Sequence, residues 1–244
     1  PHKGQRGIGG ATGSVRLAAN GLAGETHIER EDGCQIKILL PEEENTLTWQ
    51  AVANHFPNTD HWTTIALSGG SLGISSGSLG GKTPAHNFSY PLGTGVLAPR
   101  ASKDGYIDTS TRIRLEHHIA ESLKPAATAI KESGNSSFVI VGGMPLAMTK
   151  LIHTIRRSEV PENLNGLGVD CSDLGHLIKT FSELSIPARL ALPGMSSKKC
   201  EYMPLGVTIP RQAMRSLGVH AAVVSTSGPK ETLLSRLTAE VKAA

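Results

Sequence analysis

The stretch FVIVGGMPLAMTKLIHTIRR, Phe138 to Arg157, predicts a strand, a tight turn and a helix in succession. Its first four residues are apolar and mostly β-branched, which is typical of a strand buried on both faces. Gly142 and Gly143 interrupt this run, and Pro145 suits the start of a helix, where its missing N–H has no cost. The helix then shows apolar residues on one face and two cations at its end: Met148, Leu151, Ile152, Ile155, Arg156 and Arg157.

The glycine turn of this unit is a candidate anion site. Exposed N–H groups at the start of a helix attract anions, and glycines let a phosphate approach the backbone closely. Gly142 and Gly143 are therefore candidate phosphate-binding residues. The alternative, that they merely make a tight turn, is favoured because no GxGxxG or GxxxxGK[ST] pattern accompanies them.

Length and composition limit the classes of function. A chain of 244 residues is long enough for one large or two small domains with a substantial core. The net charge of +3 permits binding to a polyanion without demonstrating it, and 4% aromatic residues argue against stacking on single-stranded bases. No apolar run approaches the length of a membrane span, and no signal peptide is expected at the start.

The cysteine and acid patterns predict neither a disulfide framework nor a metal site. The chain has three cysteines, an odd number without CxxC spacing: Cys34, Cys171 and Cys200. This pattern favours a reducing compartment, and hence the cytoplasm. Asp170, Cys171, Asp173 and His176 form a local cluster of candidate ligands, but a helix-capping aspartate and a surface histidine explain them more simply. We expect Ser172 or Asp173 to cap the helix that follows. We expect no cofactor and no metal.

The sequence divides into three portions. Residues 1–24 are rich in glycine and alanine and predict an N-terminal arm, whose residues 1–13 we expect to contact a neighbouring subunit. Residues 25–105 predict a β-rich portion with long Gly/Ser loops, in which Glu42–Glu44 form a solvated loop. Residues 106–244 predict an α/β portion.

Within the second portion, Gly81-Lys82-Thr83 resembles the end of a P-loop. We interpret it as a chance likeness, because Ser76 stands where that motif needs glycine and Pro84 follows immediately. In the third portion, strands alternate with helices, including a strand at Ala188–Leu192 and a short helix from Pro210. Such alternation predicts a parallel or mixed sheet covered by helices.

No catalytic motif stands out, and no serine or cysteine occurs in a recognisable nucleophile signature. Ser196–Lys199 predicts a basic loop beyond a strand end, so Lys198 and Lys199 join the phosphate or anion candidates. The candidates for contact with a nucleic-acid backbone are cations on the arm and at the helix end: Lys3, Arg6, Arg156 and Arg157.

These patterns predict an α+β or α/β fold and leave two classes of function open. The first is a self-assembling structural protein of capsid or nucleocapsid type, a homo-oligomer in a virion that contacts nucleic-acid phosphates. The glycine-rich arm, the Gly/Ser loops and the mild basicity favour it. The alternative is an α/β enzyme that binds a phosphate-bearing small molecule at Gly142–Pro145, because strand ends in such folds form ligand crevices.

Overall fold

The computed structural model describes residues 8–16, 35–56, 59–101, 105–134, 136–156, 158–192 and 194–243. Within these ranges, a six-stranded sheet has the strand order β5-β4-β3-β6-β8-β7. Its strands have these bounds: β3 His61–Leu67, β4 Leu72–Ser78, β5 His86–Tyr90, β6 Ser137–Val141, β7 Gly168–Asp170 and β8 Ala221–Ser225. The central strands β3, β6 and β8 are parallel, and the other three run antiparallel to their neighbours, so the sheet is mixed.

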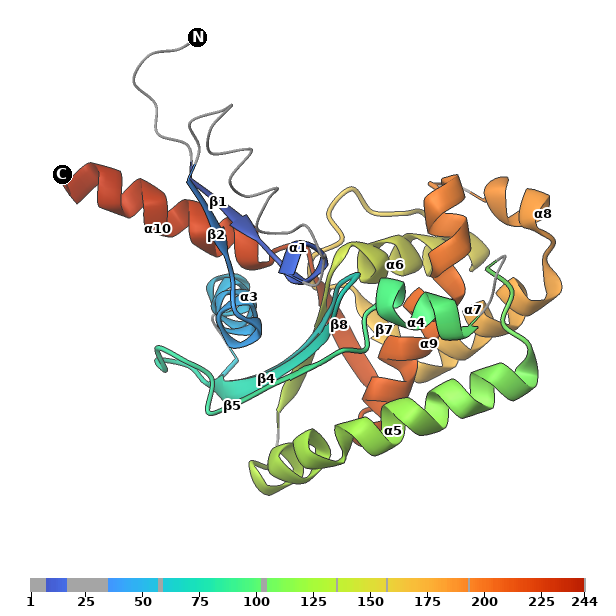
Figure 1. Cartoon of the computed structure of the whole chain (residues 1–244), viewed down its shortest axis with the longest axis horizontal. Helices are drawn as coiled ribbons and strands as arrows, with labels where there is room; N and C mark the ends of the chain where they lie inside the picture. Colours follow the sequence, from blue (N-terminus) through green and yellow to red (C-terminus); the bar gives the residue numbers. More distant parts are fainter. Residues whose placement is uncertain are drawn as a thin grey trace, which may run out of the picture.

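Helices cover both faces of this sheet (Figure 1). One face carries α3 (Pro41–His55) and α10 (Pro229–Ala243), which contact each other. The other face carries these helices: α4 Thr94–Ala101, α5 Thr109–Glu132, α6 Gly143–Ile155, α7 Cys171–Glu183, α8 Ile186–Leu190 and α9 Ser197–Ser216. Helix α9 is the centre of this layer, since it packs against the other five. The predicted α/β fold, a mixed sheet covered by helices, is thereby confirmed.

The unit that begins at Phe138 folds as predicted. Strand β6 lies between β3 and β8, and Ile140 is fully buried. Gly142 follows with a φ of 134°, a conformation that favours glycine. A Cβ at this position would lie 2.2 Å from the carbonyl oxygen of Leu67, so a larger residue does not fit between β3 and α6.

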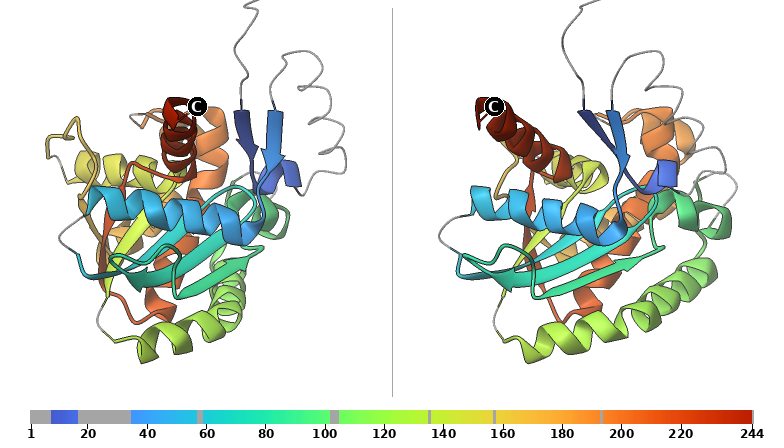
Figure 2. Two further views of the ribbon diagram at one scale, coloured as in Figure 1. Left: turned by 90° about the vertical axis from the view of Figure 1, so that its left-hand side faces the viewer. Right: turned by 60° about the vertical axis from the view of Figure 1, so that its left-hand side comes forward.

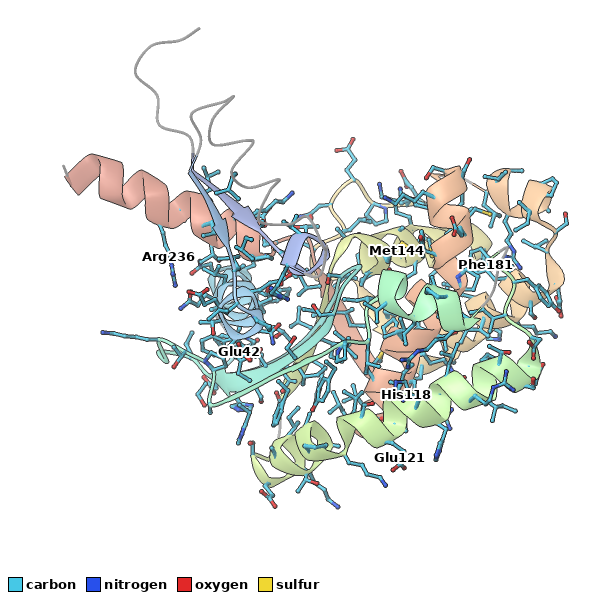
Figure 3. The ribbon with its side chains drawn as sticks, in the orientation of Figure 1. Glu42, His118, Glu121, Met144, Phe181 and Arg236 are labelled. Atoms are coloured by element: carbon cyan, nitrogen blue, oxygen red, sulfur yellow. The ribbon has the colours of Figure 1, made fainter. Side chains whose placement is uncertain are left out.

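Two short strands stand beside the main body (Figure 2). Strand β1 (Ile8–Ala11) pairs in parallel with β2 (Gln35–Ile38), and α1 (Gly13–Arg16) follows β1. The described part of the expected arm therefore pairs within its own chain. Close by, Arg236 extends from α10 towards α3 (Figure 3), where its Nη2 donates to Oε1 of Gln50 at 2.7 Å.

Long Gly/Ser loops were expected in the β-rich portion, but its glycine- and serine-rich segment from residue 68 onward contains β4, β5 and α4. Its small residues let α3 pack closely on the sheet. A Cβ at Gly77 would lie 2.9 Å from the indole of Trp49, which itself stacks on Trp62 with ring centroids 4.8 Å apart. Gly81-Lys82-Thr83 lies in the exposed turn between β4 and β5, without the helix that a P-loop requires.

Three further segments correct the sequence-based predictions. Glu42–Glu44 is not a solvated loop but part of the first turn of α3, where acids complement the helix dipole. Ala188–Leu192 is not a strand, because Ser185 caps a helix that starts at Ile186. Ser196–Lys199 is the N-cap and first turn of α9. This helix runs through two prolines, because every residue from Met203 to Pro210 is buried in the core.

Candidate active site

A pocket opens where the parallel strands β3 and β6 end side by side. Ala66 pairs with Val141 in the last rung of this ladder, and the turns that follow the two strands form a pocket of about 230 Å³. Its lining comes from five separate segments: Thr12, Glu44, Asn45, Thr48, Ala66, Leu67, Ser68, Ser71, Val141, Gly142, Gly143 and Pro229. The carboxyl ends of parallel strands are the usual place for a ligand in an open α/β sheet.

The first wall of the pocket is the start of α6. Gly142 is its N-cap and offers no side chain to the first N–H groups, which have no partner within the helix. A Cβ at Gly143 would meet no atom within 4 Å, so the approach to these N–H groups is open. The helix dipole adds partial positive charge here. This wall suits an anion.

The second wall is the turn between β3 and β4. The Oγ of Ser68 accepts hydrogen bonds from the N–H groups of Gly70 and Ser71 at 3.3 and 3.1 Å. A Cβ at Gly70 would lie 2.9 Å from the backbone of Gly13, so α1 lies directly against this turn. The turn is held from both sides and forms a rigid edge of the pocket.

The first turns of α3 supply a carboxylate to the same pocket. Glu44 is buried, and its Oε2 has no hydrogen-bond partner among the described residues. Nη1 of Arg16 lies 3.6 Å from this oxygen, and the N–H of Gly13 donates to the carboxylate. Burial raises the pKa of Glu44 above its ordinary value despite these two favourable partners. A raised carboxylate pKa in a pocket is typical of a general base or acid.

Asn45, the next residue, fixes the position of α3. Its Nδ2 donates to Oδ1 of Asn87 at 2.9 Å and to the carbonyl of Phe88 at 2.8 Å, both in β5. The hydroxyl of Thr48 donates to the carbonyl of Glu44 at 2.8 Å. These bonds hold the helix turn that carries Glu44 in place over the sheet.

The structure brings only part of the predicted site together. Gly142 and Gly143 line the pocket, but Lys198 and Lys199 lie exposed at the start of α9, where Nζ of Lys199 donates to the carbonyl of Gly194 at 3.1 Å. Arg156 ends α6, the end opposite Gly143, and forms an ion pair with Asp173. Three other candidates lie outside the described residues: Lys3, Arg6 and Arg157.

Sequence reasoning missed Glu44 and Arg16. The run Glu42–Glu44 after a proline resembled a polar loop, and Arg16 stood in a segment interpreted as an arm. One signal was present: Glu44 precedes Leu47 and Ala51 by three and seven residues, which places it on the buried face of a helix.

The candidate ligand cluster near Cys171 contains the N-cap of α7. Asp170, rather than Ser172 or Asp173, is the N-cap of α7 and accepts hydrogen bonds from the N–H groups of both. The described residues contain no group of three or more His, Cys, Asp or Glu side chains arranged to hold a metal ion.

Comparison with known proteins identifies the family. The chain matches the Ppx/GppA phosphatase family over residues 10–240 and therefore belongs to it. The exopolyphosphatase 1 proteins of Mycobacterium leprae and Mycobacterium tuberculosis are each 23% identical to it, over 228 and 231 residues. These alignments cover 93% of the chain but only 66% and 65% of the two relatives, so the chain spans about two thirds of their length.

Solved structures share the fold. An exopolyphosphatase from Cytophaga hutchinsonii superimposes with a TM-score of 0.83 at 18% identity, over 94% of this chain and 74% of that one. An Aquifex aeolicus member of the Ppx/GppA family gives a TM-score of 0.77 at 19% identity, over 95% and 74% of the two chains.

The family overturns the main functional prediction. The chain is not a capsid or nucleocapsid protein, and the expected virion and RNA-binding roles fall with that interpretation. The family instead favours the alternative, an α/β enzyme that binds phosphate. Neither the structure nor the comparisons support the expected homo-oligomer or a nucleic-acid partner. Across the described ranges, no helix combines the length and the apolar character that crossing a bilayer requires.

Proposed function

We propose that this chain carries the site of a phosphoanhydride hydrolase, located in the pocket at the ends of β3 and β6. The observation that carries the proposal is the buried carboxylate of Glu44 in the pocket that also contains the open start of α6. The relatives named exopolyphosphatase supply the substrate class, a linear polyphosphate attacked at its end.

In this proposal, the terminal phosphate of the substrate lies against the N–H groups of Gly143 and Met144 at the start of α6. The partial positive charge of the helix end compensates part of the charge that the phosphate carries. The glycine at position 142 keeps the backbone close to β3 and leaves the space in front of α6 free of side chains.

Glu44 has the role of general base. It takes a proton from a water molecule as the water oxygen bonds to the terminal phosphorus, and the bridging P–O bond to the rest of the chain breaks. The leaving phosphate oxygen takes a proton from solvent. A base is most effective when its pKa lies near the working pH, and burial moves the pKa of Glu44 in that direction. Arg16 orients the carboxylate and limits this rise.

A second candidate function is binding of a phosphate ligand without hydrolysis. Glu44 is the one acid among the described residues that line the pocket. Enzymes of phosphoryl transfer commonly hold Mg²⁺ through one or two carboxylates together with the substrate phosphates. A pocket with a single carboxylate has the smallest set of acids for such catalysis, whereas binding of a phosphate needs none. This observation favours the binding-only function as the runner-up.

Two matched variants test the site. Gly143→Glu places a negative charge at the first position of α6, where a helix tolerates it well, whereas Gly143→Gln adds similar volume without charge. We expect Gly143→Glu to abolish binding of tripolyphosphate by calorimetry and Gly143→Gln to retain part of it. Equal binding by both variants and the wild type would place the ligand elsewhere.

A third variant tests the chemistry. Glu44→Gln should bind tripolyphosphate but release inorganic phosphate at least about 100-fold more slowly, the scale of a lost general base. Wild-type protein that binds without releasing phosphate would establish the second candidate. Glu44→Gln that hydrolyses like the wild type would remove Glu44 as the base.

Two further expectations from the sequence, on localisation and on oligomeric state, are independent of the proposed hydrolase function. Cytoplasmic localisation is inferred from the unpaired cysteines, and the described Cys171 and Cys200 are both free thiols. Homo-oligomerisation stays a prediction, and the pocket as proposed is built within one chain.

A further inference from the structure

A second pocket, of about 280 Å³, lies in the helical layer on the other face of the sheet. It opens between the N-terminal turns of α5, the middle of α7, the middle of α9 and Arg189 of α8. No residue of its lining belongs to the pocket around Glu44. The proposed hydrolysis does not involve this second pocket, so the charged and apolar side chains that line it require a separate explanation.

Two guanidinium groups on the pocket share one acid. Arg112 of α5 and Arg211 of α9 lie 3.1 and 3.8 Å from Oε1 of Glu116. Both are part-buried, with 28% and 25% of the side chain exposed, so solvent screens them incompletely. This pair therefore keeps an excess of positive charge beside the pocket.

Arg189 adds a third guanidinium, which is fully buried. Its N–H groups donate to the backbone carbonyls of Gly105, Phe181 and Leu184. No carboxylate of the described residues forms an ion pair with it, and burial lowers its pKa. Backbone carbonyls satisfy hydrogen bonds but carry no net charge, so the field of Arg189 in the pocket is uncompensated.

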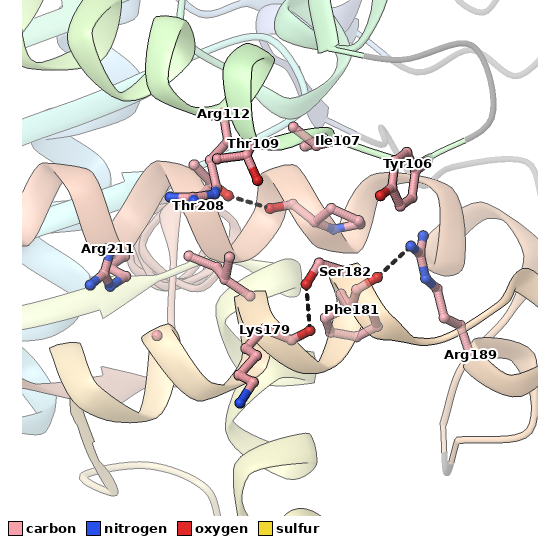
Figure 4. A pocket seen from close by; sticks show the side chains of 13 residues that line it. Tyr106, Ile107, Thr109, Arg112, Lys179, Phe181, Ser182, Arg189, Thr208 and Arg211 are labelled. Carbon is pink, nitrogen blue, oxygen red and sulfur yellow. Dashed lines mark hydrogen bonds between the residues drawn. The ribbon is translucent and has the colours of Figure 1, made fainter.

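The rest of the lining mixes apolar side chains with the hydroxyl groups of Thr109, Ser182 and Thr208. Figure 4 shows Arg112 and Arg211 on one side of Phe181 and Arg189 on the other. Phe181 is buried, and Ile178, Ile107 and Pro204 complete the apolar surface. Lys179 also lines the pocket, but its amine points away from the other labelled side chains and lies 3.8 Å from Glu183. Small-molecule sites are usually lined by apolar side chains together with a few polar groups.

We infer that this pocket binds a small phosphate monoester with an apolar body. The phosphate faces Arg112 and Arg211, whose planar forks match its oxygens, and the body packs on the half-buried Ile107 and Ile178. A dianionic phosphate fits better than a carboxylate, because one positive charge remains beyond Glu116 and Arg189 contributes another. The size of the pocket limits the body to about one ring.

Phenyl phosphate is the probe, measured by titration calorimetry against inorganic phosphate and phenol. The measurement uses the Gly143→Glu variant, in which the pocket around Glu44 repels anions. Binding of phenyl phosphate is then tested at the second pocket alone, whether or not the proposed hydrolase function is correct. We expect phenyl phosphate to bind at least about tenfold more tightly than inorganic phosphate, because ring burial contributes on that scale. Phenol should not bind.

Arg112→Gln and Arg114→Gln form a matched pair on α5. Both remove one positive charge, but Arg114 bonds to Ser110 and Thr111 and does not line the pocket. We expect Arg112→Gln to weaken phenyl phosphate binding by roughly tenfold or more and Arg114→Gln to leave it unchanged. Melting temperatures confirm that both variants are folded. Equal losses in both variants, equal binding of inorganic and phenyl phosphate, or no binding at millimolar probe would each overturn the inference.

Discussion

Gly73 of β4 leaves the space that the side chain of Asn45 occupies: a Cβ at Gly73 would lie 2.0 Å from Oδ1 of Asn45. Asn45 also donates hydrogen bonds from α3 to β5. The position of Glu44, one residue earlier on the same helix, therefore depends on the absence of a side chain in the strand beneath. Packing and the candidate active site are coupled at this contact.

Gly73→Ala should lower the free energy of unfolding by about 1–3 kcal/mol, the usual cost of overpacking, because α3 must lift from the sheet. It should weaken tripolyphosphate binding as well. Gly168→Ala in β7 is the control, since a Cβ there meets no atom within 4 Å. Denaturant unfolding measures both. A Gly73→Ala variant as stable as Gly168→Ala would contradict the close docking of α3.

The carboxylate of Glu44 makes stability depend on pH in a defined direction. Its pKa is raised by burial above the ordinary value of 4.5, so the protonated form is the one the fold favours. The stabilisation of the fold by the protonated carboxyl is complete below the ordinary pKa of 4.5 and is lost as pH rises through the pKa of Glu44 in the folded protein. We expect the neutral variant Glu44→Gln to melt at a higher temperature than the wild type at pH 7.5, with the difference vanishing near pH 4.

Glu42→Gln is the control for this experiment, because it removes an exposed carboxylate from the same end of α3. It should bring no gain in melting temperature at pH 7.5. If Glu44→Gln is instead less stable than the wild type at pH 7.5, the ion pair with Arg16 outweighs the burial of the carboxylate.

Arg189→Met should destabilise the protein by about 2–4 kcal/mol, because buried backbone carbonyls of Gly105, Phe181 and Leu184 lose their donor. Arg114→Met, on the exposed side of α5, should stay within about 0.5 kcal/mol of the wild type. Chemical denaturation compares the two. Similar stability of both variants would mean that water replaces the guanidinium of Arg189 at no cost.

The interior position of β6 makes Ile140 sensitive to charge. Ile140→Asp should yield no soluble folded protein, because it buries a carboxylate without a partner between β3 and β8. Ile140→Val should cost only about 0.5–1.5 kcal/mol, the loss of one methylene in a packed core. Soluble Ile140→Asp protein that unfolds cooperatively would argue against this assignment.

The sequence by itself determined the elements whose signals are local. β6, the Gly142 turn and α6 follow from an apolar run, two glycines and helical spacing, which involve only near neighbours in the chain. Helix α7 follows in the same way from its apolar stripe, although its N-cap is Asp170, two or three residues before the expected Ser172 or Asp173. From these alone, Gly142 and Gly143 could be chosen as candidates for an anion.

Only the tertiary structure decided the rest, because packing overrides local preference. The sequence LGISSGS has only one side chain that strands prefer, Ile74, yet it forms β4, where its small residues let α3 pack closely on the sheet. Helix α9 continues through Pro204 and Pro210 because the core buries that whole stretch. Glu44 and Gly142 line one pocket only because β3 pairs with β6 and α3 packs on β3, an arrangement of distant residues that no local pattern encodes.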